Sequence, residues 1–382
     1  MANIIDYLIW RGDVPFSVDP FNEVDALILT ELTYEHYSGI VPDTEQGVEI
    51  GRAAAVFSTR HPAEETDARK DFTRQVPPLL QMVGQSRRFA GTRLMYYHEE
   101  SDRALDMQLG IMSYLLTDGT AFVSYRGTDS TLLGWKEDFV LSYSPETEGQ
   151  RRAVNYLNEH WRDSDVPLIL GGHSKGGNLA MYAAAKCLPE IRARIRAVYS
   201  NDGPGFLDAF IESEDYRRVV PLIQSTVPED SVVGVLMRNT ARQRVVQSSA
   251  GGIMQHDGFS WQVLGNHFVT KAQRTANSLR MEAAILQWLK VQSVENRRLL
   301  VQIVFGLLEA TGMQTTHDLA ENKVALISEL HRLKENVPKE QRDLVLGMLG
   351  QFLSIGTGMF ISDVKQEMLS RVPDGFPWDA GK

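Results

Sequence analysis

Two patterns of apolar residues divide the chain. Between residues 92 and about 250, short apolar runs end at Gly, Asp or Pro clusters and are separated by amphipathic segments. Such runs predict buried strands that alternate with helices. From about residue 272 onward, apolar residues recur at helical spacing, and we find no strand signal. We therefore expect an α/β domain followed by a helical extension.

The alternation predicts a mostly parallel sheet with helices on both faces. Ligands of such sheets bind at the carboxyl ends of the strands, so the loops after those ends are the place to look for chemistry. The apolar runs place strands at residues 92–98, 106–116, 120–125, 166–170, 193–200, 217–225 and 245–249. Amphipathic segments place helices at residues 4–10, 24–32, 64–75, 78–83, 150–161 and 178–187.

Helical periodicity after residue 272 predicts a second region. We expect residues 1–271 to form the α/β domain, residues 272–364 to form helices that pack on it or act as a lid, and residues 365–382 to form a tail. The predicted helices of this extension span residues 278–292, 296–311, 317–336 and 338–354. An apolar stripe that includes Leu299, Leu300, Ile303 and Val304 predicts a core-facing surface.

One strand–turn–helix segment carries the strongest chemical signal. Residues 168–182 read as an apolar strand, a glycine-flanked turn and a helix, and Ser174 lies at the tip of the turn. The turn fits the Gly-x-Ser-x-Gly pattern, in which Gly172 and Gly176 leave room for a strained backbone around an exposed hydroxyl. We predict that Ser174 is a nucleophile and that the following helix points its N-terminus at the reaction centre.

A serine hydroxyl needs a histidine to take its proton and an acid to orient that histidine. In the chain order of hydrolases with such a turn, the acid and then the histidine follow the serine. We favour His256, which lies in a Gly-rich loop after the last predicted strand, over His267. We favour Asp230, just past a predicted strand, as the acid. Asp202 is the alternative acid, and Glu229 is a third choice.

An acyl-transfer site also needs donors for the developing oxyanion. The main-chain N–H of Lys175, directly after the serine, is one candidate. Thr128, at the end of an earlier strand, offers both its N–H and its hydroxyl. Asp138 is a candidate anchor for that loop, with Arg126 as its ion-pair partner. We expect the side chain of Lys175 to face solvent and His173 to pack beside the turn rather than act as the base.

Composition argues against several other classes of function. The 382 residues carry a net charge of −10 with no concentrated basic stripe, which disfavours a nucleic-acid partner. Cys187 is the single cysteine, so no intrachain disulfide or thiolate metal site is expected. Neither metal-ligand spacing nor a phosphate-binding glycine loop is evident, so we expect no metal and no cofactor. The chain has no signal-peptide pattern and no transmembrane segment, so we expect a cytoplasmic protein.

The residues that carry these motifs also resemble a known family. Residues 125–128 (Tyr-Arg-Gly-Thr), 134–138 (Gly-Trp-Lys-Glu-Asp) and 172–177 (Gly-His-Ser-Lys-Gly-Gly) are similar to the class 3 lipase pattern. Together with residues 13–34 and 254–261, they resemble the bacterial Mbeg1-like family (DUF2974). This resemblance covers residues 1–270. Class 3 lipases usually have leucine at the position of Lys175. Because this chain has lysine there, the resemblance does not predict its acyl pocket.

The resemblance implies an α/β-hydrolase fold with a catalytic triad of Ser174, Asp230 and His256 and with Thr128 in the oxyanion hole. We therefore expect a serine hydrolase that acts on a small-molecule ester or lipid through an acyl-enzyme. A thioesterase or amidase with the same triad is the alternative enzyme. A binding protein that keeps the hydrolase fold without catalysis is the alternative from another class. The C-terminal helices could also join copies of the chain into a homo-oligomer.

Overall fold

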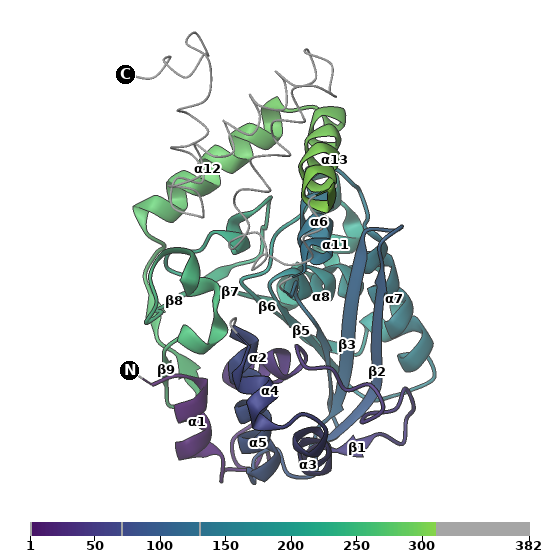
Figure 1. Cartoon of the computed structure of the whole chain (residues 1–382), viewed down its shortest axis with the longest axis vertical. Coiled ribbons are helices and arrows are strands. Elements are labelled where there is room, and N and C mark those ends of the chain that lie inside the picture. The colour runs from purple at the N-terminus through teal and green to yellow at the C-terminus, as the bar shows by residue number, and fades with distance from the viewer. Residues whose placement is uncertain (1, 70–71, 130, 311–382) are drawn as a thin grey trace.

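A computed structural model of the chain describes residues 2–69, 72–129 and 131–310 (Figure 1). The predicted helices at residues 317–336 and 338–354 and the predicted tail at residues 365–382 lie outside the described residues.

Among the described residues, nine strands form one sheet in the order β1-β2-β3-β4-β5-β6-β7-β8-β11. The strands from β4 to β8 pair in parallel, whereas β1 to β4 and the β8–β11 pair are antiparallel. The sheet is therefore mixed rather than mostly parallel, with a parallel centre. Its strands are β1 (Val48–Glu49), β2 (Arg93–Asp102), β3 (Met107–Leu115), β4 (Ala121–Tyr125), β5 (Leu168–His173), β6 (Ile195–Asn201), β7 (Ile223–Pro228), β8 (Gln243–Val246) and β11 (Thr270–Lys271). A separate hairpin pairs β9 (Val263–Leu264) with β10 (His267–Phe268).

The helices precede, interrupt and follow this sheet. The helices before β2 are α1 (Ile4–Arg11), α2 (Glu23–Leu32), α3 (Ile50–Arg60), α4 (Ala63–Asp67) and α5 (Val76–Gln85), the last three of which follow β1. Those between its strands are α6 (Leu132–Val140), α7 (Glu148–Trp161), α8 (Lys175–Lys186), α9 (Pro189–Arg192), α10 (Asp208–Ile211) and α11 (Glu214–Val219). The extension contributes α12 (Ala276–Val291) and α13 (Val294–Ala310).

Alternating side chains on the strands build a core on each face of the sheet. On β4, Phe122 packs with residues of α1, α2, α3 and α5, whereas Ala121, Val123 and Tyr125 pack with residues of α7 and α8. The two-residue period of a strand places these neighbours on opposite faces. The two helical layers lie on either side of the sheet in Figure 1. This α/β architecture has the helices on both faces that the sequence predicts.

One expected strand is partly a helix. We predicted a strand at residues 217–225, but α11 occupies its first part and β7 begins only at Ile223. Ser213 caps α11 by accepting a hydrogen bond from the main chain of Tyr216, and this satisfies a donor in the first turn. The apolar residues before Ile223 therefore belong to the packed face of a short helix rather than to a strand.

The described part of the extension packs against the α/β domain at two places. Met281 and Ile285 of α12 contact Val232. Val301 and Phe305 of α13 pack against Leu132 on α6, and Figure 1 shows α13 lying directly over α6. Lys136 on α6 also pairs with Glu309 on α13 at 3.1 Å. The outer face of α6 is thus covered by α13.

Because Phe305 is 4% exposed within this contact, we expect the extension to unfold together with the α/β domain. Phe305→Ala should lower the free energy of unfolding by about 3 kcal/mol through the lost packing and the cavity left behind. Calorimetry of the full chain should show one transition that shifts to lower temperature. Two transitions, of which the variant moves only one, would show instead that the extension is an independent domain.

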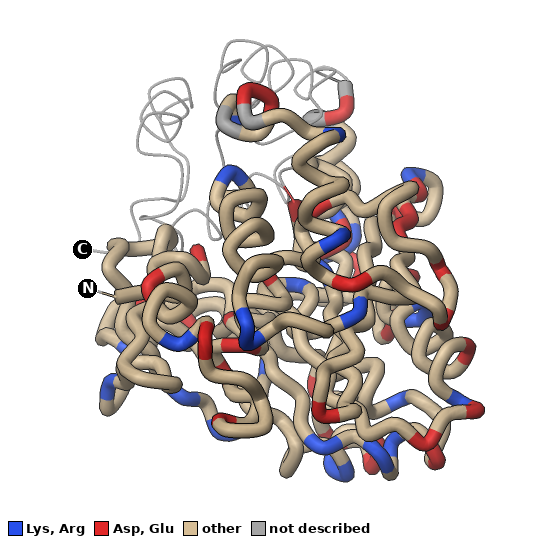
Figure 2. The backbone as a smooth tube through the Cα atoms, turned by 90° about the horizontal axis from the view of Figure 1, so that it is seen from below, with Lys and Arg blue, Asp and Glu red and all other residues tan. Residues whose placement is uncertain are grey.

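Charged residues of both signs are interspersed along the backbone in Figure 2, rather than gathered by sign on one side. The full sequence carries a net charge of −10.

Candidate active site

Ser174 lies on a sharp turn between β5 and α8, as the motif predicts. Its backbone has φ 57° and ψ −133°, a conformation that side chains rarely adopt. A side chain on Gly172 would overlap the main chain of Gly176, and a side chain on Gly176 would overlap the carbonyl of Tyr125. The two glycines therefore make the turn possible. Ser174 itself is 7% exposed.

His256 and Asp202 meet beside this turn. The Nδ1 atom of His256 lies 2.7 Å from Oδ2 of Asp202. The other carboxylate oxygen of Asp202 accepts hydrogen bonds from Ser231 Oγ at 2.6 Å and from the Gly234 N–H at 3.1 Å. Asp202 is fully buried and has φ 48°, in the left-handed region. The carboxylate is thus held by three donors and orients the ring so that Nε2 is left as the proton acceptor.

Ser174 is fixed to the same strand end. Its N–H donates to the carbonyl of Asn201, the residue before Asp202, at 2.9 Å. The ring of His256 packs on the ring of His173, the residue before Ser174, with centroids 4.5 Å apart. The structure therefore brings Ser174, His256 and Asp202 to one end of neighbouring strands.

Asp230 does not reach His256, contrary to our preferred assignment of the acid. Its Oδ1 accepts a hydrogen bond from Thr275 Oγ1 at 2.6 Å, and Thr275 is the cap that begins α12. Asp230 follows β7, which is one strand further from the serine-bearing β5 than β6 is. Strand neighbours are about 4.8 Å apart, so the carboxylate after the adjacent strand β6 is the one within reach.

Glu229 and His267 have different surroundings. Glu229, the third choice for the acid, pairs loosely with Lys271, at 3.8 Å. His267, the second choice for the base, is exposed in the β9–β10 hairpin. The histidine that contacts a strand-end carboxylate beside Ser174 is therefore His256, and that carboxylate belongs to Asp202 rather than to Asp230.

Two main-chain segments border Ser174 where an oxyanion would form. Lys175 is the first residue of α8, so its N–H has no acceptor within the helix. Gly127, in the loop after β4, lies so close that an added Cβ would come within 3.0 Å of the Cβ of Ser174. The next residue, Thr128, donates its hydroxyl proton to Asp138 Oδ2 at 2.6 Å. Its main-chain N–H is therefore the group left to serve as a second donor.

We expected Arg126 to form an ion pair with Asp138, but it does not. Its guanidinium lies 2.8 Å from Glu99 instead. His36 on one side and Arg126 on the other lower the pKa of the Glu99 carboxyl to about 2, against the opposing effect of burial. Asp138 anchors the loop through its hydrogen bond with Thr128.

Asp138 is a partly buried carboxyl with few partners. Burial raises its pKa to about 6, although Lys175, Thr128 and His256 oppose the shift and Glu137 adds to it. A raised pKa means that the folded protein binds the proton more tightly than the unfolded chain does. The stabilisation from this group is therefore present at low pH and is lost as the pH rises from about 4 to about 6.

Asp138→Asn should remove this pH dependence, because asparagine keeps an acceptor for Thr128 but does not ionise. We expect the free energy of unfolding of the variant, relative to wild type, to rise by about 3 kcal/mol between pH 4 and pH 6 and then to level off. Urea unfolding at unit steps from pH 4 to pH 8 measures the difference. A difference that does not change with pH would contradict the raised pKa.

Comparison with known proteins identifies the family of this chain. The sequence matches the family described as Mbeg1-like over residues 83–306, more than half of the chain. The chain belongs to the Mbeg1-like family. None of the curated proteins matches it.

Solved structures share distant similarity with this Mbeg1-like chain. The native propeptide complex of a Rhizomucor miehei lipase has 14% identity and a TM-score of 0.34, covering 53% of this chain and 69% of that one. A crystal structure of M37 lipase has 12% identity and a TM-score of 0.35, covering 57% and 70%. Similarity at this level supports no argument about activity.

Residues before the family match also reach the site, although we predicted a site role for none of them. Tyr34, just after α2, donates its hydroxyl proton to Nδ1 of His173 at 3.0 Å. The Nε2–H of His173 in turn donates to the main-chain carbonyl of His256 at 2.7 Å. Burial and the neighbouring His256 lower the pKa of His173 well below its usual range. His173 is thus a neutral, buried residue that links the segment after α2 to the loop of His256. We expected it to pack beside the turn rather than act as the base, and these contacts agree with that.

A second unexpected group is the Glu31 carboxyl, which is fully buried 3.8 Å from Nδ1 of His173. Burial, followed by the charge of Asp257, raises the pKa of Glu31 well above its usual range. The raised pKa favours the neutral form of this carboxyl beside the His173 ring.

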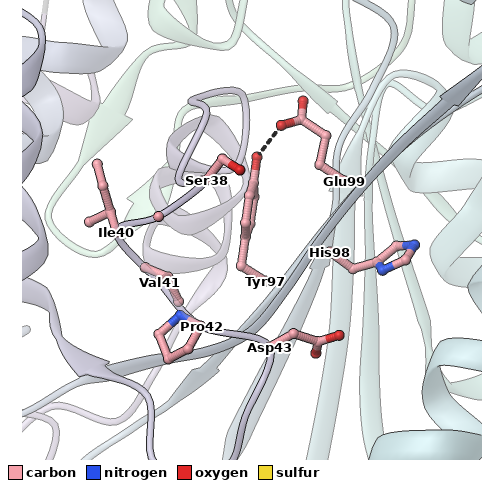
Figure 3. Close-up of a pocket in the computed structure, with 9 residues that line it drawn as sticks. Ser38, Ile40, Val41, Pro42, Asp43, Tyr97, His98 and Glu99 are labelled. Carbon is pink, nitrogen blue, oxygen red and sulfur yellow. Dashed lines mark hydrogen bonds between the residues drawn. The ribbon is translucent and has the colours of Figure 1, made fainter.

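A surface cavity of about 450 Å³ lies apart from these residues. Its walls are residues 38–43 and 97–99, and Tyr97 donates its hydroxyl proton to Glu99 at 2.7 Å (Figure 3). None of the residues that we predicted for catalysis lines it.

Among the described residues, we find no group of three or more His, Cys, Asp or Glu side chains arranged to hold a metal ion. Over the same residues, no helix has the length and apolar character that a bilayer crossing requires.

Proposed function

We propose that this Mbeg1-like protein is a serine hydrolase that cleaves carboxylic esters. The observation that carries the proposal is the 2.7 Å contact between His256 Nδ1 and Asp202 Oδ2 beside a serine on a strained, glycine-flanked turn. A buried carboxylate, an oriented imidazole and a serine at a helix N-terminus are the parts that activate a hydroxyl for acyl transfer.

In the proposed reaction, Ser174 Oγ attacks the ester carbonyl carbon while His256 Nε2 takes the hydroxyl proton. Asp202 accepts the Nδ1–H and stabilises the imidazolium that forms. The negative oxygen of the tetrahedral intermediate is held by the N–H groups of Lys175 and Thr128. The bond from the carbonyl carbon to the alcohol oxygen then breaks, and the alcohol leaves with the proton from His256.

Water completes the proposed cycle. His256 takes a proton from a water molecule, whose oxygen attacks the acyl carbon bound to Ser174. The second tetrahedral intermediate collapses, the acid leaves and Ser174 recovers its proton from His256. None of these steps draws on a metal or a cofactor.

A panel of p-nitrophenyl esters of increasing acyl length, with matched thioester and amide substrates, tests the substrate class. We expect turnover of esters above that of the amides. Faster turnover of the thioesters at equal acyl length would favour a thioesterase. No turnover of any substrate by folded protein would favour a non-catalytic binding protein.

Cellular location and self-association are two further predictions. We predict that the protein is cytoplasmic, and fractionation of the source cells tests this. We also predict association through the C-terminal helices, and sedimentation of the full chain over a range of concentrations tests that.

A further inference from the structure

Lys175 is not exposed, although its charge predicts a solvent-facing side chain. Its ammonium group donates to Glu137 Oε2 at 2.6 Å and to the main-chain carbonyl of Gln108 at 2.9 Å. The side chains of Lys175 and Glu137 are each 1% exposed. An ammonium group is buried in this way only when a counter-charge compensates for its lost hydration.

The partners of this ion pair lie on different elements. Glu137 belongs to α6, and its Oε2 also accepts the N–H of Gln108 on β3 at 3.1 Å. The side-chain amide of Gln108 donates to Asp129, which directly follows Thr128. The pair therefore joins α8, α6 and β3 immediately behind the serine turn.

Both candidate oxyanion donors depend on these elements. The N–H of Lys175 belongs to the same residue whose ammonium group forms the ion pair. Thr128 is held by Asp138, the neighbour of Glu137 on α6. A change in the distance between α6 and α8 would move one donor relative to the other. Donors lose most of their effect when they are displaced from the position where the charge develops.

We propose that the buried Lys175–Glu137 ion pair is a positioning element that sets the separation of the two oxyanion donors. Lys175 is then a positioning residue through its side chain, in addition to supplying its N–H. This inference rests on the proposed hydrolase function and extends it to residues that do not touch substrate.

Another buried ion pair provides a matched control. Arg88 and Asp25 are both fully buried, with an N–O distance of 2.5 Å, and they join α2 to the segment before β2. Neither residue contacts the serine turn through any hydrogen bond in the described part of the chain. A pair that only stabilises the fold should behave like Arg88–Asp25 when it is broken.

The test compares Lys175→Met, Glu137→Gln and Arg88→Met with wild type in full-length protein. For the first two variants we expect kcat for a p-nitrophenyl ester to fall by about 10²- to 10³-fold, the effect of losing one oxyanion donor, with KM within a few-fold of wild type. For Arg88→Met we expect a lower melting temperature but kcat within about threefold of wild type.

The double variant Lys175→Met/Glu137→Met covers the case in which a single variant fails to fold. Removing both charges leaves no unpaired ion, so this protein should fold. It should still show the low kcat, because the hydrogen bonds to Gln108 are lost.

Unchanged kcat in the folded Lys175 and Glu137 variants would overturn the positioning proposal while leaving the hydrolase proposal intact. Equal kcat losses for Lys175→Met and Arg88→Met would also overturn it, since they would reflect general destabilisation. Failure of wild type to turn over esters or to react with a fluorophosphonate would instead refute the proposed function.

Discussion

Ser174→Ala should abolish ester turnover and leave the fold intact. The side chain is small and 7% exposed, so its loss removes little packing. Its hydroxyl oxygen is the atom that forms the acyl-enzyme in the proposed mechanism. Loss of a serine nucleophile lowers kcat by about 10⁴-fold or more, down to the activity that the oxyanion donors and binding alone supply. Steady-state kinetics with a p-nitrophenyl ester measures the loss.

Ser174→Gly is a second variant that separates chemistry from folding. Glycine adopts φ 57° and ψ −133° without the strain that serine experiences there. We expect this variant to be as inactive as the alanine variant but more stable than it by about 1 kcal/mol, as measured by urea unfolding. Ser38→Ala, at an exposed position, is a control that should change neither quantity. Wild-type activity in either Ser174 variant would exclude Ser174 as the nucleophile.

Asp202→Asn should lower kcat by about 10³- to 10⁴-fold, and Asp230→Asn should change it by no more than a few-fold. An amide at position 202 cannot stabilise an imidazolium and favours the wrong tautomer of His256. Asparagine tolerates the left-handed backbone at φ 48°, so the substitution should not strain the loop. The two variants are a matched pair because each converts one strand-end carboxylate into an amide.

The contrast between these variants decides which carboxylate orients His256. Asp230→Asn should mainly weaken the start of α12, where its carboxylate accepts from Thr275. Its effect should therefore appear as a lower melting temperature rather than as lost kcat. A larger kcat loss for Asp230→Asn than for Asp202→Asn would contradict the assignment of Asp202.

Local patterns predicted the parts of the site that depend on neighbouring residues. The Gly-x-Ser-x-Gly turn requires glycine at Gly172 and Gly176 for steric reasons that are visible in the sequence. His256 followed from its Gly-rich loop after the last strand. The identity of the acid could not be predicted in this way, because the choice between Asp202 and Asp230 depends on which strand lies beside β5. Strand order is a long-range property that no local pattern records.

Partners distant in sequence explain the remaining differences. Lysine is almost always exposed, so Lys175 was expected in solvent, and only the folded chain brings Glu137 against it. Tyr34 reaches His173 across a separation of 139 residues, which no local pattern records. The fold class was predictable because it rests on the period of apolar residues. The mixed sheet follows from the antiparallel pairing of β1 to β4.

The most direct test of the account is labelling with a fluorophosphonate, which reacts with a serine that a base has already activated. The wild-type chain should gain one adduct, which tandem mass spectrometry should place on Ser174. His256→Ala, although it keeps the serine, should react at a rate lower by about 10³-fold or more. An adduct on another residue, or equal labelling of wild type and His256→Ala, would contradict the claim that His256 activates Ser174.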